Sequence, residues 1–122
     1  MLVIALAVGA AWGVFCAWGD VQGASFVEGF ANTAGPWALL AFASGFVAGD
    51  AIRGIIVSFA VLFGGLAAYR IAQAAVLDDA SAPSLLTTGA WALLFAIAAA
   101  VFGAAGSVAR TARGARRGIA WG

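Results

Sequence analysis

Few side chains in this sequence could do chemistry, and the most informative of them is Arg70, which lies inside the apolar stretch 51–77. Tyr69 precedes it and Gln73 follows one helical turn later, so the three can share one end of a helix. A guanidinium inside a membrane span is costly and marks a functional site by default. We therefore predict a candidate polar site of Arg70, Gln73 and Tyr69, joined by Asn32 from an earlier polar segment.

Two interpretations of this polar site stay open. The Arg70 side chain can extend outward along its own stem and anchor the helix, with Asp78 and Asp79 as nearby ionic partners. Alternatively, it binds a ligand or an ion. Asn32 likewise either caps the next helix or belongs to an interrupted helix entry whose backbone groups bind something, as in transporters.

The residues that are absent from the chain exclude much enzyme chemistry. There is no His, which excludes haem held by imidazole, a His-based zinc site and a Ser-His-Asp relay. The single cysteine, Cys16, lies in an apolar run and is expected to pack as a small hydrophobic residue. We therefore predict no enzyme activity, no cofactor and no bound metal.

The composition indicates that the solvent of this protein is lipid. Of the 122 residues, 65% are hydrophobic and only 9% are charged, whereas a soluble domain carries about 25% charged residues. Alanine and glycine together supply 50 residues, 33 and 17 respectively. Both a water-soluble globule and a disordered chain are excluded, because neither has this balance of apolar and charged residues.

The apolar runs predict an all-α domain, an integral membrane bundle of four transmembrane helices. The predicted spans are residues 2–19, 36–49, 51–77 and 85–109, followed by a basic tail over 110–122. The second span has about 14 residues, which is short for a hydrocarbon core of about 30 Å. Either this helix begins near Phe26 and kinks at Pro36, or the segment is re-entrant.

The distribution of charges predicts the orientation. With four spans, Arg53 and the four arginines of the tail share one side, while four of the five acids share the other. Because Lys and Arg collect on the cytoplasmic side, both termini are expected in the cytoplasm, with the protein in the plasma membrane. Trp18, Trp37 and Trp91 fall near the outer ends of three spans, where an aromatic belt is expected.

Small residues recur at four-residue spacing in every predicted span. Such rows let helix backbones approach closely, which matters in lipid because no hydrophobic force drives helices together there. We predict helix-packing roles for six glycines and expect the rows to leave a face for a partner. These are Gly9, Gly13, Gly45, Gly49, Gly64 and Gly103.

The basic tail is interpreted as a contact with lipid head groups and a determinant of topology. Its arginines follow directly after a span, where they meet the acidic inner leaflet. No folded module or interleaved aromatic residues accompany them, so nucleic acid is not an expected partner. The residues concerned are Arg110, Arg113, Arg116 and Arg117.

The string at residues 32–42, Asn-Thr-Ala-Gly-Pro-Trp-Ala-Leu-Leu-Ala-Phe, resembles a signature of a family of uncharacterised bacterial multi-pass membrane proteins, a domain of unknown function. The stretches 62–69 and 101–106 fit the same pattern. The resemblance covers about residues 2–110 and implies a multi-pass helical architecture without implying an activity. Family members are expected to be longer, so the ending at 118–122 is either the start of a further helix or a natural shortening.

Two functions from different classes follow from the sequence. The first is an accessory or scaffold subunit that packs against a larger membrane complex or against copies of itself. The second is a small oligomeric transporter or channel with an outward-facing polar site around Arg70. The first is favoured because conduction needs polar residues through the whole membrane, and the inner halves of the spans offer little beyond Ser44 and Ser58.

Overall fold

A computed structural model describes residues 1–22, 34–76 and 85–121, and all the regular secondary structure in these ranges is helical. The prediction of an all-α protein with four helices is therefore confirmed for the described residues. The helices are α1 (Leu2–Gln22), α3 (Ala34–Ala48), α4 (Ala51–Ile71) and α5 (Leu85–Trp121), with a short π-helical segment η1 (Ala72–Val76) that continues α4.

Three of the four helices have the length and apolar composition of membrane spans. These are α1, α4 with η1, and α5, whose apolar portions are Leu2–Gly19, Ala51–Ala75 and Leu85–Gly118. Helix α3 has 15 residues, which at 1.5 Å per residue is about 22 Å and less than the roughly 30 Å hydrocarbon core. Within the described residues the second predicted span is thus a single short helix, and the alternative start near Phe26 lies outside those residues.

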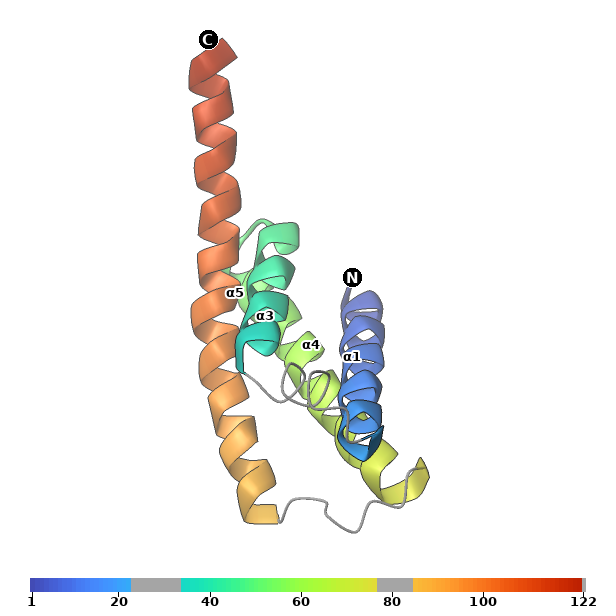
Figure 1. The fold of residues 1–122 in the computed structure, drawn as a ribbon. Helices are drawn as coiled ribbons and strands as arrows, with labels where there is room; N and C mark the ends of the chain where they lie inside the picture. Colours follow the sequence, from blue (N-terminus) through green and yellow to red (C-terminus); the bar gives the residue numbers. More distant parts are fainter. Residues whose placement is uncertain (23–33, 77–84, 122) are drawn as a thin grey trace.

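The helices alternate in direction, as Figure 1 shows: α1 and α4 run one way, and α3 and α5 run the other way. The beginning of α1, the turn between α3 and α4, and the end of α5 all point toward the same end of the bundle. Helix α3 runs along the bundle without turning back on itself. Helix α4 packs against all three other helices, whereas the extensive contacts of α1 are with α4.

The turn between α3 and α4 is built by Gly49 and Asp50. Gly49 has φ +78°, a left-handed conformation that glycine tolerates best, and its N–H donates to the Gly45 carbonyl at 3.1 Å. Asp50 then caps α4 by accepting the backbone N–H of Arg53 at 3.2 Å. The predicted helix-packing role of Gly49 is therefore corrected: this glycine ends α3 and reverses the chain.

Helix α5 is longer than the predicted fourth span. The fourth span was predicted to end at residue 109, with a basic tail over 110–122, but the helix continues without a break to Trp121. Arg and Ala are strong helix formers, and no proline interrupts the segment. The Thr111 hydroxyl also donates back to the Ser107 carbonyl at 3.1 Å. The part of α5 beyond residue 109 extends past the rest of the bundle (Figure 1).

Three helices meet closely at a junction formed by Gly45 on α3, Gly54 on α4 and Gly103 on α5. A Cβ added to Gly54 would stand 2.7 Å from the Gly103 carbonyl oxygen and 3.1 Å from the Gly45 Cα. A Cβ on Gly103 would lie 2.7 Å from the Ser58 hydroxyl oxygen. Backbones touch here without intervening side chains, so this junction admits no residue larger than glycine without rearrangement.

Helix α1 joins the bundle through a second glycine contact. A Cβ on Gly9 would collide with the backbone carbonyl of Val61, and one on Gly13 would collide with that of Gly65. Gly64, which was predicted to pack in the same way, is looser: its added Cβ would meet a Leu6 methyl carbon at 3.1 Å.

Cys16, also on α1, is 1% exposed and belongs to the main hydrophobic cluster. The prediction that this cysteine packs as a small hydrophobic residue is confirmed. The other fully buried members of the cluster come from the remaining helices and are Trp37, Ala41, Leu62, Phe95 and Ala99. Residues of all four helices thus contribute to the cluster that contains Cys16.

Candidate functional site

Three of the four residues of the predicted polar site come together at the end of α4. The Gln73 side-chain amide donates from Nε2 to the Tyr69 hydroxyl oxygen at 2.9 Å. Its other amide atom, Oε1, accepts a hydrogen bond from Arg70 Nη1 at 3.3 Å. Gln73 therefore links the phenol to the guanidinium. Asn32, the fourth predicted member, lies outside the described residues.

Burial differs among the three linked residues. Gln73 is only 2% exposed, so its side chain is held inside the protein. Tyr69 and Arg70 are partly exposed, and Tyr69 also packs against the main hydrophobic cluster. A buried amide with both ends hydrogen-bonded has a defined orientation, because turning it over would oppose its N–H groups to the arginine. The Arg70 side chain is therefore held on one side by a fixed acceptor.

Local helix geometry explains why these residues meet. Arg70 lies in the last turn of α4, and η1 begins two residues later. The Ala72 N–H donates to both the Ala68 and the Tyr69 carbonyls, so the last bond of α4 is shared between an α-type and a 3₁₀-type acceptor where η1 begins. A positive charge in the last turn of a helix is favoured by the helix dipole. Single π-helical turns are also frequent at functional sites.

The described hydroxyl groups of the helix interiors do not form a polar path. Ser44 donates to the Leu40 carbonyl of its own helix at 2.7 Å. Ser58, which is fully buried, donates across to the Ala41 carbonyl of α3 at 2.7 Å. Ser107 donates to the Ala104 carbonyl at 2.7 Å. These hydroxyls are occupied by backbone carbonyls, and Ser58 ties two helices together.

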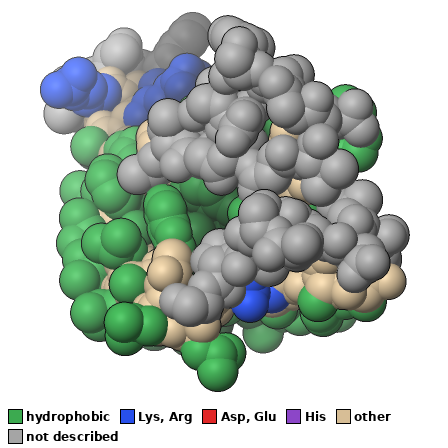
Figure 2. Space-filling view, turned by 60° about the horizontal axis from the view of Figure 1, so that its bottom comes forward, with side chains coloured by type: hydrophobic (Ala, Val, Ile, Leu, Met, Phe, Trp, Pro, Cys, Tyr) green, Lys and Arg blue, Asp and Glu red, His purple; other side chains and the backbone are tan. Residues whose placement is uncertain are grey.

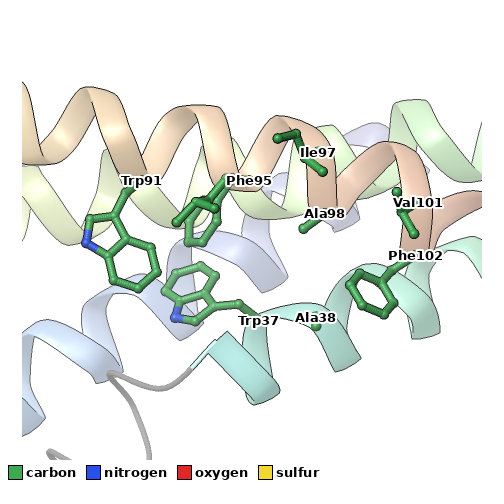
Figure 3. Close-up of a pocket in the computed structure, with 9 residues that line it drawn as sticks. Trp37, Ala38, Trp91, Phe95, Ile97, Ala98, Val101 and Phe102 are labelled. Carbon is green, nitrogen blue, oxygen red and sulfur yellow. The ribbon is translucent and has the colours of Figure 1, made fainter.

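An apolar groove of about 280 Å³ lies between α3 and α5 (Figure 3). Aromatic rings form one end of it. The Phe95 ring lies 4.6 Å from that of Trp37 and 5.8 Å from that of Trp91, measured between centroids. Ile97 and Val101, on the α5 wall of the groove, are more than half exposed. With a lining this apolar, the groove can accept hydrocarbon or apolar side chains, and it offers no group for catalysis.

The four arginines in the part of α5 beyond residue 109 differ in their contacts. Arg110 donates from Nη1 to the carbonyls of Phe46 and Val47, at 3.4 Å from the Phe46 oxygen. These carbonyls belong to the last turn of α3, so the guanidinium caps that helix. All four arginines are exposed, and the other three are Arg113, Arg116 and Arg117. In Figure 2, basic side chains lie in separate places on a surface whose described helices are mainly hydrophobic.

Several structurally important residues were missed from the sequence. The cap supplied by Arg110 bridges 63 residues, and the Ser58 bond bridges 17. Neither contact can be predicted from the residues next to it in the sequence. Gly106 was also missed, although its added Cβ would collide with the Phe42 carbonyl. Its position three residues after Gly103 is a helical packing spacing that could have indicated it.

Comparison with protein-family models, with curated proteins and with solved structures finds no match for this chain. Conclusions about function therefore depend on the chain's own residues and geometry.

Proposed function

We propose that this protein is a small multi-pass membrane protein that acts as an accessory or scaffold subunit, packing against a larger membrane complex or against a second copy of itself. In this proposal all four helices cross the plasma membrane with both termini in the cytoplasm, and the protein catalyses no reaction. Resemblance to the bacterial membrane family of unknown function remains part of the proposal, and it concerns architecture alone.

The observation that carries the proposal is the outer face of α5. Ala96, Ala100 and Ala104 follow one another at four-residue spacing, and each is at least partly exposed. By contrast, the most tightly packed glycines are used inside the bundle. Small residues at this spacing allow another helix to approach closely in lipid. The neighbouring groove between α3 and α5 adds an apolar recess for side chains of the partner.

Association can be tested by enlarging this alanine row. We expect the purified chain in mild detergent to carry a bound protein or to form a defined oligomer, measured by native mass spectrometry. The double variant Ala100→Leu with Ala104→Leu is expected to lose that association while keeping its helix content. Ile97→Leu, a conservative change at an exposed position of the same helix, serves as the control. A chain that is monomeric and partner-free in native membranes, crosslinked before extraction, would contradict the proposal.

Transport is the second candidate, favoured by the hydrogen-bonded group of Tyr69, Arg70 and Gln73 at one end of the bundle. It requires a polar path to the other end, whereas the described serines are bonded to backbone carbonyls. Measuring solute flux in liposomes distinguishes the scaffold function from the transport function. Solute flux that Arg70→Ala abolishes would overturn the scaffold proposal, and intact association without flux would exclude transport.

A further inference from the structure

Arg70 lies at the opposite end of α4 from Arg53, and the distance between the two is informative. They are separated by 17 residues of continuous helix, which corresponds to about 26 Å along the axis. This is close to the roughly 30 Å thickness of the hydrocarbon core. If α4 crosses the membrane, both arginines therefore lie near its two surfaces, at the depth of lipid phosphates.

The guanidinium of Arg70 retains capacity for an anion. Within the described part of the chain, its side chain makes one hydrogen bond, from Nη1 to Gln73 Oε1. Arginine carries five N–H donors in a planar fork that matches the oxygens of a phosphate. Because Gln73 is buried and bonded to Tyr69, it fixes the position of one edge of the Arg70 guanidinium. The remaining N–H groups of the guanidinium are left to bind an anion.

An apolar stripe leads away from Arg70 along the same face of α4. Phe59, Phe63 and Leu66 precede Arg70 at spacings of four, three and four residues, which places all four on one side of the helix. All four are partly exposed. The three apolar side chains also pack against the main hydrophobic cluster, so an acyl chain would contact only the part of each that stays exposed. The rings of Phe59 and Phe63 are stacked, with centroids 5.4 Å apart and planes 11° apart. From Phe59 to Arg70 the stripe is about 16 Å long, about half of the hydrocarbon thickness.

The Arg70 guanidinium lies near the depth of the lipid phosphates, and the apolar stripe beside it is about one leaflet long. This arrangement is complementary to a phospholipid, which has an anionic phosphate group and an acyl chain. We propose that Arg70 binds the phosphate group of one phospholipid, whose acyl chain lies along Leu66, Phe63 and Phe59. Gln73 is a positioning residue that orients the guanidinium. This binding site is independent of the association proposed for α5, because it uses a different helix and a different chemical group.

The test measures lipid that stays bound through purification. The chain is extracted in mild detergent, and bound phospholipid is counted by native mass spectrometry while collision energy is raised. Arg70→Gln is expected to lower retention at least about tenfold, the effect of losing a charge-assisted hydrogen bond. Arg70→Lys, which keeps the charge without the fork, is expected to retain an intermediate amount. Arg53→Gln, at the other end of the same helix, is expected to retain as much lipid as the wild type.

Competition distinguishes a lipid from a free anion. An excess of inorganic phosphate or glycerol phosphate is expected to leave the bound lipid in place, because neither has an acyl chain to contact the apolar stripe. Displacement by either compound would overturn the proposal in favour of a site for soluble anions. Equal retention by the wild type, Arg70→Gln and Arg53→Gln would also overturn it. Circular dichroism of each variant checks that the compared chains have the same helix content.

Discussion

The two glycine-based contacts of this protein differ in how many helices they join. At the junction of Gly45, Gly54 and Gly103, three helices meet backbone to backbone, and a buried serine bonds two of them. At Gly9 and Gly13, α1 meets α4. Small residues create both contacts, but only the junction of Gly45, Gly54 and Gly103 brings three helices together at one point. Because the extensive contacts of α1 are with α4 alone, we expect α1 to separate from the bundle before α3, α4 and α5 separate from one another.

The largest expected effect follows from filling the three-helix junction. Gly103→Ala places a methyl group 2.7 Å from the Ser58 oxygen and 2.8 Å from the Gly54 carbonyl oxygen. We expect it to lower the free energy of unfolding by about 2 kcal/mol or more, the usual cost of overpacking. The measurement is unfolding by SDS in mixed micelles. Gly89→Ala, on the same helix with open space around it, should be neutral or stabilising by up to about 1 kcal/mol.

A smaller effect is expected at the contact of α1, although the clash there is closer, because α1 packs mainly against α4 and can move as a whole. Gly13→Ala forces its methyl group against the Gly65 carbonyl and brings it to 3.0 Å from the Tyr69 backbone nitrogen. We expect α1 to move away at a cost of about 1–2 kcal/mol, while the other three helices stay folded. Cys16, 1% exposed, is the reporter: a thiol reagent should label it several-fold faster than in the wild type.

Gly64→Ala is the matched control for this separation, because its added carbon meets a flexible Leu6 methyl group at 3.1 Å and the Leu6 backbone only at ordinary contact distances of 3.4 and 3.5 Å. Labelling of Cys16 should then stay near the wild-type rate. If Gly13→Ala instead abolished the whole unfolding transition, α1 would be an integral part of the same cooperative unit, and the proposed difference between the two contacts would be wrong.

Ser58→Ala tests the hydrogen bond within the three-helix junction. Removing the donor to the Ala41 carbonyl should cost about 0.6–1.7 kcal/mol, the range measured for bonds between membrane helices. Ser44→Ala removes a hydroxyl that bonds within its own helix, so its unfolding curve should nearly coincide with that of the wild type. Equal losses in the two variants would show that the link between helices adds nothing.

The smallest effect is expected for Arg110→Gln, which removes the charged cap from the last carbonyls of α3. The cost should be about 0.3–1 kcal/mol. Hydrogen exchange in the last turn of α3 should become faster, because that turn loses a partner that stabilises its carbonyls. Arg113→Gln, three residues along the same helix, is the control and should leave exchange in α3 unchanged.

From its composition and from the length of its apolar runs, the sequence predicts an all-helical chain with four helices, and three of the helices are long and apolar enough to span a membrane. It also grouped Arg70, Gln73 and Tyr69, since residues three and four apart on a helix are neighbours. It was less accurate at the ends of helices. The charge pattern predicts a tail after residue 109, although the Arg and Ala residues there favour the helix that forms.

Only the tertiary structure decided which small residues touch. Gly45, Gly49 and Gly103 look alike in the sequence, yet one pair meets at a junction and Gly49 turns the chain. The partners of Arg110 and Ser58 likewise lie 63 and 17 residues away. The physical reason is that helical periodicity reports neighbours within one helix. Contacts between helices depend on how the helices are placed against one another, and glycine is common in every span of this chain.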